Sequence, residues 1–416
     1  MSLSPWIRMC LLAPAIALAG NAHAQGWQPD TAFNAAGNPL ASVPGAQTLV
    51  GRAVLAQPDG ALLVAGNTAD GKNDFGADFL LLRYLPDGSL DTGFGGGGAS
   101  RVSLGEKRDI AYALLQQPDG KLVAVGGSEG GGAQGSVAVV RYLPDGSLDP
   151  AFDGDGVAVT TLNIGNVSAL AGALQADGKI LAAGHDNAHG FVLVRYNSDG
   201  SPDAGFGAGG VVVIKPGPRA WANALLVQAD GRVVLAGHSG DGAVIALLRL
   251  LPDGALDPSF GDGGIVSTEA GVQRSTASAV TQLADGSLLV AGTTRLDDSS
   301  PQQMIALRYL PDGSLDEAFG TGGAVLVPSS EPAAATAVLP QADGKVVLAG
   351  YQRTANDRRD PVLVTLSAEG AVIGRQLLPA QGSATIAAAV VQVDGKLVLA
   401  GAAADCDGIL LQRLQP

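Results

Sequence analysis

The feature that most constrains this chain is an internal repeat of roughly 50 to 60 residues. One repeated motif is an apolar run, a Q-x-D-G turn and a second apolar run that ends in Ala-Gly or a variant. A second motif, R-Y-L-P-D-G-S-L-D-x-x-F-G, alternates with it. The first motif occurs seven times, 51 to 60 residues apart, with its turn glycine at Gly60, Gly120, Gly178, Gly231, Gly286, Gly344 and Gly395. Such repetition is typical of propellers and solenoids.

Each repeat contains four short runs of strand type, which in the third unit cover 179–183, 191–196, 211–214 and 222–227. The runs are rich in Val, Leu, Ile and Ala, and Gly or Pro-Asp-Gly separates them. Pro sets the first turn dihedral, Asp bonds its own backbone, and Gly adopts the positive φ. One repeat therefore has the size and content of a four-stranded propeller blade.

The two ends of the sequence complement each other. Residues 409–416 stop half-way through the second motif, and residues 27–33 resemble the missing half. Six whole units and these two halves make seven blades. We therefore predict an all-β fold, a seven-bladed β-propeller of four-stranded antiparallel blades that is closed by pairing of the N- and C-terminal strands. Closure leaves no large open edge, whereas a linear β-solenoid would not need complementary ends.

The first 24 residues have the pattern of a secretory signal peptide. An arginine precedes an apolar run over 9–19, and Ala-His-Ala at 22–24 is a small-x-small cleavage site. A membrane anchor would need about 20 uninterrupted apolar residues, and Pro14 interrupts this shorter run. We therefore expect residues 1–24 to be removed on export, and residues 25–416 to form one propeller domain in the periplasm or outside the cell.

The charge of the chain limits its partners. The formal net charge is −14, and a negative protein repels phosphate backbones and anionic membranes. Acids at the repeated turn positions account for about half of the 39 Asp and Glu residues, so the acidity does not imply a cationic ligand. We expect a monomer without a membrane span, whose partner is an extracellular protein or glycan and not nucleic acid.

The paired Q-P-D-G-K-x-x-x-A-G and R-Y-x-P-D-G-S-L-D-x-x-F-G elements resemble the delta-60 repeat β-propeller family, a bacterial domain of unknown function. The resemblance covers nearly all of residues 25–416. It implies the propeller fold and export, and it brings no catalytic residues with it. The sixth unit departs from the pattern, because Val364-Thr365 replaces Arg-Tyr and no Asp-x-x-Phe follows.

The arginine of the second motif precedes an aspartate by eight residues, as in Arg141 and Asp149. Asp30 is the expected mate of Arg413 across the closure. These pairs form either a ring of charge that binds a ligand or a structural bond that recurs in each blade, with Phe94 and its equivalents filling the space beneath. We favour the structural interpretation, because a residue repeated in every blade usually serves the blade.

The connections between strands fall into two groups. The Q-x-D-G and P-D-G turns share one face and hardly vary, whereas the connections on the opposite face differ in every unit. Loops that contact a ligand have reason to diverge, although loops also drift where nothing constrains them. We select candidate binding residues on these connections chiefly among aromatic and arginine side chains, because these dominate binding hot spots. The candidates are His185, Asp186, Trp221, His238, Tyr351, Arg358 and Arg359.

Metal and cofactor signals are weak. His185 and His238 follow Ala-Gly in adjacent units, so a two-histidine metal or acid–base site with Asp186 is the alternative to solvated loop histidines. Asp-Gly-Asp-Gly at 153–156 resembles a fragment of a calcium loop but lacks the other ligands. No cofactor is required by the sequence, and a bound calcium ion is a minor alternative.

Three functions remain open. The leading hypothesis is a secreted, non-enzymatic propeller that binds a protein or glycan. The alternative is an extracellular enzyme, either a carbohydrate-active hydrolase or lyase or a quinone-dependent dehydrogenase. A purely structural module of the cell surface is the third. Propellers support both binding and catalysis, so the site must decide between them.

Overall fold

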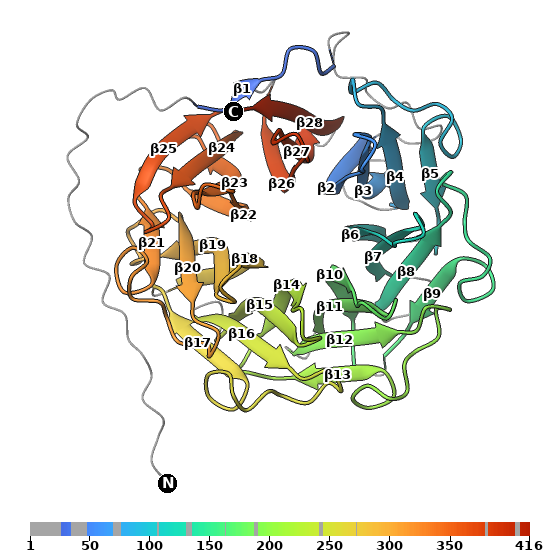
Figure 1. The fold of residues 1–416 in the computed structure, drawn as a ribbon, viewed down its shortest axis with the longest axis horizontal. Helices are drawn as coiled ribbons and strands as arrows, with labels where there is room; N and C mark the ends of the chain where they lie inside the picture. The colour runs from blue at the N-terminus through green and yellow to red at the C-terminus, as the bar shows by residue number, and fades with distance from the viewer. Residues whose placement is uncertain are drawn as a thin grey trace.

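The computed structural model confirms the predicted architecture: seven four-stranded antiparallel sheets surround a central opening (Figure 1). The structure describes residues 26–34, 48–69, 76–105, 108–129, 135–162, 164–186, 190–240, 244–271, 273–378, 382–403 and 408–416. Within these ranges the chain forms no helix long and apolar enough to cross a membrane.

The sheets are numbered here as blades 1 to 7, and their strands are given from the axis outward. Blades 1 and 2 comprise β2 (Thr48–Ala56), β3 (Leu62–Ala69), β4 (Phe79–Tyr84) and β5 (Ala99–Val102), then β6 (Asp109–Gln116), β7 (Leu122–Ser128), β8 (Ser136–Tyr142) and β9 (Val157–Thr160). Blades 3 and 4 comprise β10 (Val167–Leu174), β11 (Ile180–Asp186), β12 (Phe191–Tyr196) and β13 (Val211–Ile214), then β14 (Trp221–Val227), β15 (Val233–Ser239), β16 (Val244–Leu250) and β17 (Ile265–Glu269). Blades 5 and 6 comprise β18 (Gln273–Gln282), β19 (Leu288–Arg295), β20 (Gln303–Tyr309) and β21 (Ala324–Val327), then β22 (Ala333–Pro340), β23 (Val346–Arg353), β24 (Arg359–Leu366) and β25 (Val372–Leu377). Blade 7 comprises β26 (Ala384–Val391), β27 (Leu397–Ala403), β28 (Gly408–Gln415) and β1 (Gln28–Pro29).

Blade 7 takes three strands from the C-terminal part of the chain and its outermost strand from the N-terminal part (Figure 1). β1 pairs antiparallel with β28, so that Gln28 lies opposite Gln415 and Pro29 opposite Leu414. The N–H of Asp30 extends this pairing by donating to the carbonyl of Arg413 at 2.9 Å. The expected closure by the N- and C-terminal strands is therefore confirmed.

The sequence unit and the blade begin at different strands. The expected run over 222–227 is β14, which is the first strand of blade 4 and not the fourth strand of blade 3. The Q-x-D-G turn consequently joins the first and second strands of one blade. A repeat has the same period whichever strand is counted first, and only hydrogen bonding between strands decides where a blade begins.

Each innermost strand carries a β-bulge opposite the glycine of the Ala-Gly ending. In blade 4 the register shifts between Ala222 and Ala224, and a Cβ at Gly237 would lie 1.8 Å from the carbonyl oxygen of Trp221. Only glycine permits so close an approach of two backbones. The same approach, at 1.8 to 1.9 Å, recurs at Gly66, Gly126, Gly184, Gly237, Gly292, Gly350 and Gly401.

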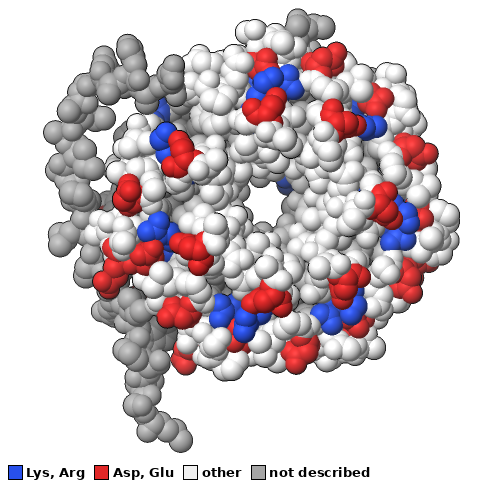
Figure 2. Space-filling model, in the orientation of Figure 1, with Lys and Arg blue, Asp and Glu red and all other residues white. Residues whose placement is uncertain are grey.

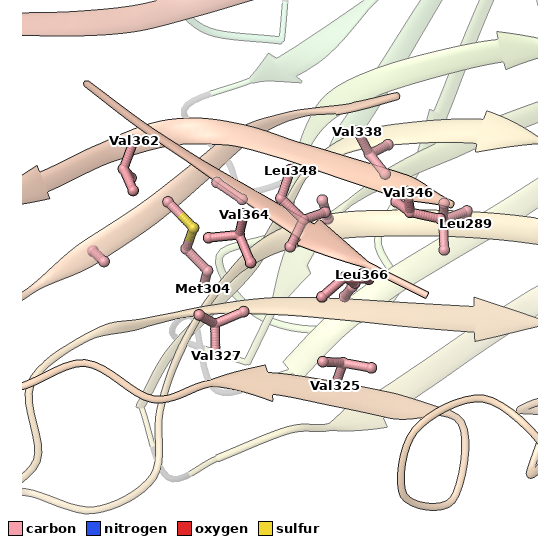
Figure 3. Close-up of a cluster of buried hydrophobic side chains, with 14 of the residues drawn as sticks. Leu289, Met304, Val325, Val327, Val338, Val346, Leu348, Val362, Val364 and Leu366 are labelled. Carbon is pink, nitrogen blue, oxygen red and sulfur yellow. The ribbon is translucent and has the colours of Figure 1, made fainter. Parts of the chain in front are cut away.

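Apolar side chains of neighbouring blades pack face to face. The described core residues form seven clusters, one at each junction between blades. Figure 3 shows the junction of blades 5 and 6, where Leu289 and Met304 face Leu348 and Val364, all at most 1% exposed. Burial of one such side chain contributes about 1.5–3 kcal/mol to the free energy of folding. The ring is therefore stabilised both by apolar contacts between sheets and by hydrogen bonds within each sheet.

An arginine at the end of the third strand also joins one blade to the next. Nε of Arg249 donates to Oδ2 of Asp257 at 2.7 Å, and its guanidinium lies 4.5 Å from the ring centroid of Phe260. Nη1 of Arg249 donates to the carbonyl of Pro311, in the P-D-G turn of blade 5. We refer to this arginine, aspartate, phenylalanine and carbonyl as an arginine clasp. Clasps form at Arg141, Arg195, Arg249, Arg308 and Arg413.

The clasp of Arg413 crosses the closure of the ring. Its Nε lies 2.8 Å from Oδ2 of Asp30, and its guanidinium lies 4.5 Å from the ring centroid of Phe33. The predicted pairing of Arg413 with Asp30 is therefore confirmed. The clasps are buried or half-buried, and each has several partners inside the molecule, which agrees with the structural interpretation of the repeated Arg–Asp pairs.

Candidate functional site

Antiparallel pairing sorts the connections of each blade onto two faces. The Q-x-D-G turn joins the first strand to the second, and the P-D-G segment joins the third to the fourth, so both lie on one face. The connections from second to third strand, and from one blade to the next, lie on the opposite face, which we name the variable face. The expected sorting of similar and dissimilar connections is thus confirmed. Parts of the variable connections, such as 187–189 and 241–243, lie outside the described residues.

Three of the predicted site residues meet on the variable face. The ring of His185, on β11, stacks on the indole of Trp221, on β14, with 4.1 Å between centroids and 11° between planes. The ring of His238, on β15, lies 5.6 Å from the same indole at 45°. Trp221 nevertheless remains 39% exposed. We refer to these three residues as the aromatic cluster.

Strand register explains why the cluster forms. Trp221 and His238 are directly opposite each other in the β14–β15 pair. His185 has the corresponding position on β11 of blade 3, and alternate residues of a strand share one side. Leu181 and Ala183 therefore lie on the same side of β11 as His185, and both pack against core residues of blade 4. The side chain of His185 is consequently directed toward Trp221.

His238 is fixed in place by a neighbouring blade. Its Nδ1 lies 3.2 Å from Oγ1 of Thr276, which also accepts a hydrogen bond from Nδ2 of Asn223 at 2.9 Å. Burial lowers the pKa of His238 below its ordinary value of 6.5, because an apolar environment disfavours the charged ring. The imidazole is therefore neutral at pH 7 and contributes packing and hydrogen bonding to the cluster.

Asp186 does not join the aromatic cluster. Its side chain is buried, and Oδ1 accepts the N–H of Gly190 at 2.5 Å. In the hypothetical calcium fragment, Oδ1 of Asp155 likewise accepts the N–H of Val157 at 2.9 Å. Across the described ranges, no three His, Cys, Asp or Glu side chains are grouped so that they could hold a metal ion. Asp186 is therefore not placed to complete a two-histidine site.

A hollow of about 210 Å³ lies beside His185, between blades 2 and 3. Gly127 has the position on β7 that His185 has on β11. A Cβ at Gly127 would lie 2.4 Å from Oγ of Ser168, so this glycine allows the two blades to approach closely at the edge of the hollow. The lining also includes Arg108, Tyr112, Glu129 and Asn166. A ligand that contacts the aromatic cluster would have polar groups within reach here.

The other predicted residues form a separate group in blade 6. The guanidinium of Arg359 lies 5.1 Å from the ring centroid of Tyr351, and Nε of Arg358 lies 2.7 Å from Oδ1 of Asp360. Blade 5 separates this group from the aromatic cluster (Figure 1). Six of the seven candidates therefore lie in two separate groups and not in one site, and Asp186 belongs to neither group.

Sequence reasoning did not identify the bulge residues of the innermost strands. Nδ2 of Asn223, at the bulge of β14, donates to the carbonyl of Ala277 in blade 5 at 2.9 Å. The guanidinium of Arg52, at the bulge of β2, lies 5.0 Å from the ring centroid of Tyr112 in blade 2. These contacts run along the inner strands from one blade to the next. The repeated strand glycine was the available signal, because it occurs where no turn requires it.

The repeated ionic groups have partners within the protein. Figure 2 shows Lys and Arg beside Asp and Glu in groups that recur around the ring and its central opening. In the clasp of blade 4, burial raises the pKa of Asp257, but hydrogen bonds from Ser259 and Arg249 outweigh burial and lower it to about 2. Asp257 is thus an anion at neutral pH with its charge already compensated.

Solved structures are similar to this chain at low sequence identity. A protein from Lactobacillus plantarum is 14% identical, with a TM-score of 0.50, over 85% of this chain and 99% of its own. The WD40 domain of Neurospora crassa Pan2 is 12% identical, with a TM-score of 0.46, over 89% of each chain. The polysaccharide lyase Uly1 is 12% identical, with a TM-score of 0.44, over 92% of this chain and 95% of its own. A comparison with curated proteins found no match.

One family model matches the repeats themselves. It covers residues 57–94, 117–152, 175–206, 228–260, 283–319 and 341–372, which together make up half of the chain. The first four segments run from a Q-x-D-G turn to the phenylalanine of the following Asp-x-x-Phe, and the fifth begins at Leu283 of the equivalent Leu-Ala-Asp-Gly turn and ends at Phe319. The description of this family is a β-propeller domain of unknown function, which agrees with the fold and with the resemblance noted in the sequence, although it does not carry the delta-60 name. The chain therefore belongs to the domain of unknown function (DUF5122) beta-propeller family.

Proposed function

We propose that this protein is an exported, non-enzymatic β-propeller that binds an extracellular protein or glycan through its variable face. The aromatic cluster is the centre of the proposed binding surface. The observation that carries the proposal is the 39% exposure of Trp221, although His185 stacks on its indole. An exposed tryptophan held rigidly by neighbours loses little conformational entropy on binding, and tryptophan is enriched among the residues that dominate interfaces.

The surroundings of the cluster favour binding over catalysis. A glycan hydrolase needs two carboxyl groups that face each other across the substrate. Asp186, the acidic residue next to His185, is instead buried and bonded to Gly190. The enzymatic alternative is a carbohydrate-active hydrolase or lyase or a quinone-dependent dehydrogenase. No pair of facing carboxyl groups at the aromatic cluster supports it among the described residues. Export by residues 1–24 is part of the proposal.

Capture of ligands on glycan and protein arrays tests the proposed surface. Trp221→Ala should abolish capture, and replacement of 185–190 by Gly and Ser should do the same. Val213→Ala is a matched control, because Val213 is also an apolar residue with 39% exposure but lies on the outermost strand of blade 3. Thermal unfolding of each variant checks that the ring remains folded.

Replacing 351–361 by Gly and Ser tests whether the group in blade 6 takes part. Loss of capture in that variant would extend the surface across blade 5. Capture that survives the changes at Trp221, 185–190 and 351–361, but is lost on mutation of the Q-x-D-G face, would contradict the proposal.

A further inference from the structure

The junction of blades 6 and 7 differs from the junctions that carry an arginine clasp. Strand pairing places Thr365, and not Val364 as the sequence comparison had it, at the position of the clasp arginine, because Thr365 pairs with Val347 as Arg308 pairs with Leu289. Ile373, eight residues later, stands where the aspartate would be. A tight turn joins β24 to β25, with the N–H of Ser367 donating to the carbonyl of Ala371 at 2.8 Å. The chain therefore enters β25 directly, without an Asp-x-x-Phe segment to fill the junction.

Blade 7 contributes less to this junction than the other blades contribute to theirs. Its third and fourth strands, β28 and β1, are not consecutive in the chain, so no P-D-G turn joins them. Trp27 packs on the core cluster between blades 6 and 7, and its carbonyl accepts a hydrogen bond from Nε2 of Gln376 at 2.6 Å. The indole thus covers part of the space that a phenylalanine and a turn fill elsewhere.

A hollow of about 800 Å³ remains at this junction. Its lining combines apolar and polar residues, and Oε1 of Gln376 is buried without a hydrogen-bond partner among the described residues. Its charged lining residues are Asp343, Lys345 and Arg375, and its apolar lining includes Trp27, Val347 and Leu363.

Lys345 is the group whose environment differs most from its equivalents. The corresponding lysine contacts a clasp aspartate in other blades, as in Lys121–Asp149 at 3.2 Å and Lys179–Asp203 at 3.1 Å. These two lysine side chains are 27% and 30% exposed. Lys345 has only the aspartate of its own turn, at 2.6 Å, as its ion-pair partner among the described residues, and is 49% exposed. In blade 6 the hollow therefore lies beside Lys345 on the side where the lysines of other blades contact a clasp aspartate.

We propose that this hollow binds an acidic peptide segment of a partner protein, with an Asp or Glu followed three residues later by an aromatic residue. Such a segment would carry the same carboxylate and aromatic side chains as the Asp-x-x-Phe sequence that belongs to other blades of this chain. Its carboxylate would pair with Lys345, and its ring would pack against Trp27, Val347 and Leu363.

Apolar exposure next to the hollow supports a peptide as its occupant. Val372, Ile373 and Leu377 on β25 are 41%, 44% and 54% exposed, and Ile373 lines the hollow. A peptide that enters the hollow would cover part of this surface, and a single ion would not. The lining residues Gln341, Asp343 and Gly395 belong to Q-x-D-G turns, so the site is on the face opposite the aromatic cluster and does not depend on the proposed function.

Binding of a labelled heptapeptide with the sequence of 314–320, S-L-D-E-A-F-G, tests the site by fluorescence anisotropy. We expect saturable binding with one peptide per chain. Lys345→Ala should weaken it roughly threefold to fivefold, the effect of a partly exposed ion pair. A peptide with alanine in place of phenylalanine should bind more than about tenfold more weakly. A peptide with asparagine in place of its first acidic residue should bind wild type and Lys345→Ala equally.

Lys179→Ala is the matched control, because Asp203 already occupies the equivalent place in blade 3. It should leave peptide affinity unchanged, and both variants should melt like wild type. The proposal is overturned if the peptide does not saturate the wild-type protein, or if Lys179→Ala weakens binding as much as Lys345→Ala. It is also overturned if the peptide dissociates a dimer seen by sedimentation, because a second copy would then be the occupant.

Discussion

The five clasped junctions and the junction of blades 6 and 7 are alternative solutions to one packing problem. At a clasped junction, a single arginine closes the ends of the sheets by contacting a carboxylate, an aromatic ring and the turn of the next blade. At the junction of blades 6 and 7 the apolar core continues, but the clasp is absent and a hollow takes its place. The comparison indicates that the core is sufficient to hold two blades together, and that the clasp is an addition at the outer part of one face.

Truncation after Gly395 is the most severe way to break this comparison. It removes β27 and β28, so blade 7 is lost and Asp30 and Phe33 lose Arg413. The edges exposed on blades 6 and 1 should cause aggregation, and the cooperative thermal transition should disappear. Deletion of Pro416 alone, which lies beyond β28, is the control. A truncated chain that melts like the full chain would show that the shared blade is not needed.

Arg141→Ala removes one clasp and leaves the neighbouring cores unchanged. Both members of its pair are buried, at 5% and 4% side-chain exposure, so the variant leaves the buried carboxylate of Asp149 with Lys121 as its remaining ionic partner among the described residues. We expect a loss of about 2–4 kcal/mol in the free energy of unfolding, measured by urea denaturation. Thr365→Ala, at the position without a clasp, should cost much less. Equal effects of the two changes would mean that the clasp contributes nothing beyond the core.

Substitution of the strand glycine opposite the bulge should have a similar effect in every blade, because the bulge is present even in blade 6. Added Cβ atoms at Gly237 and Gly350 would lie 1.8 and 1.9 Å from a backbone oxygen. Gly237→Ala and Gly350→Ala should therefore each destabilise the protein by about 1–3 kcal/mol. A much smaller effect at Gly350 would show that blade 6 is loosened throughout and not only at its outer strands.

The sequence alone was sufficient to predict the ring, because each repeat carries its own turns and strand lengths. The Arg413–Asp30 pair could be predicted in the same way, since the motif shows which residue is missing at each end. The bonds from the clasps to the next blade could not be predicted, because they depend on how two sheets approach each other. The hollow was also beyond sequence reasoning, since Trp27 and Thr365 are brought together only by ring closure.

The candidate site shows the same limit on a smaller scale. His185, Trp221 and His238 could be selected by residue type and connection, but their contact depends on strand register and on the facing of neighbouring blades. Asp186 was selected because it is adjacent to His185 in sequence. Adjacent residues of a strand point to opposite sides, and this places Asp186 away from the cluster.

Acid provides the mildest perturbation that distinguishes the two kinds of junction. The pKa of Asp257 falls from 3.8 to about 2 in the folded protein, so its contribution to stability is fully present above pH 3.8 and is lost as the pH falls toward 2. Wild type should therefore lose on the order of 1 kcal/mol through this group over that range. Asp257→Asn should be less stable at pH 7 and should show a flatter dependence of unfolding free energy on pH. Hydrogen exchange at pH 2.5 should increase near the clasp of blade 4, while strands β24 and β26 retain their relative protection. Exchange that increases first between blades 6 and 7 would instead show that this junction is the weakest point of the ring under acid.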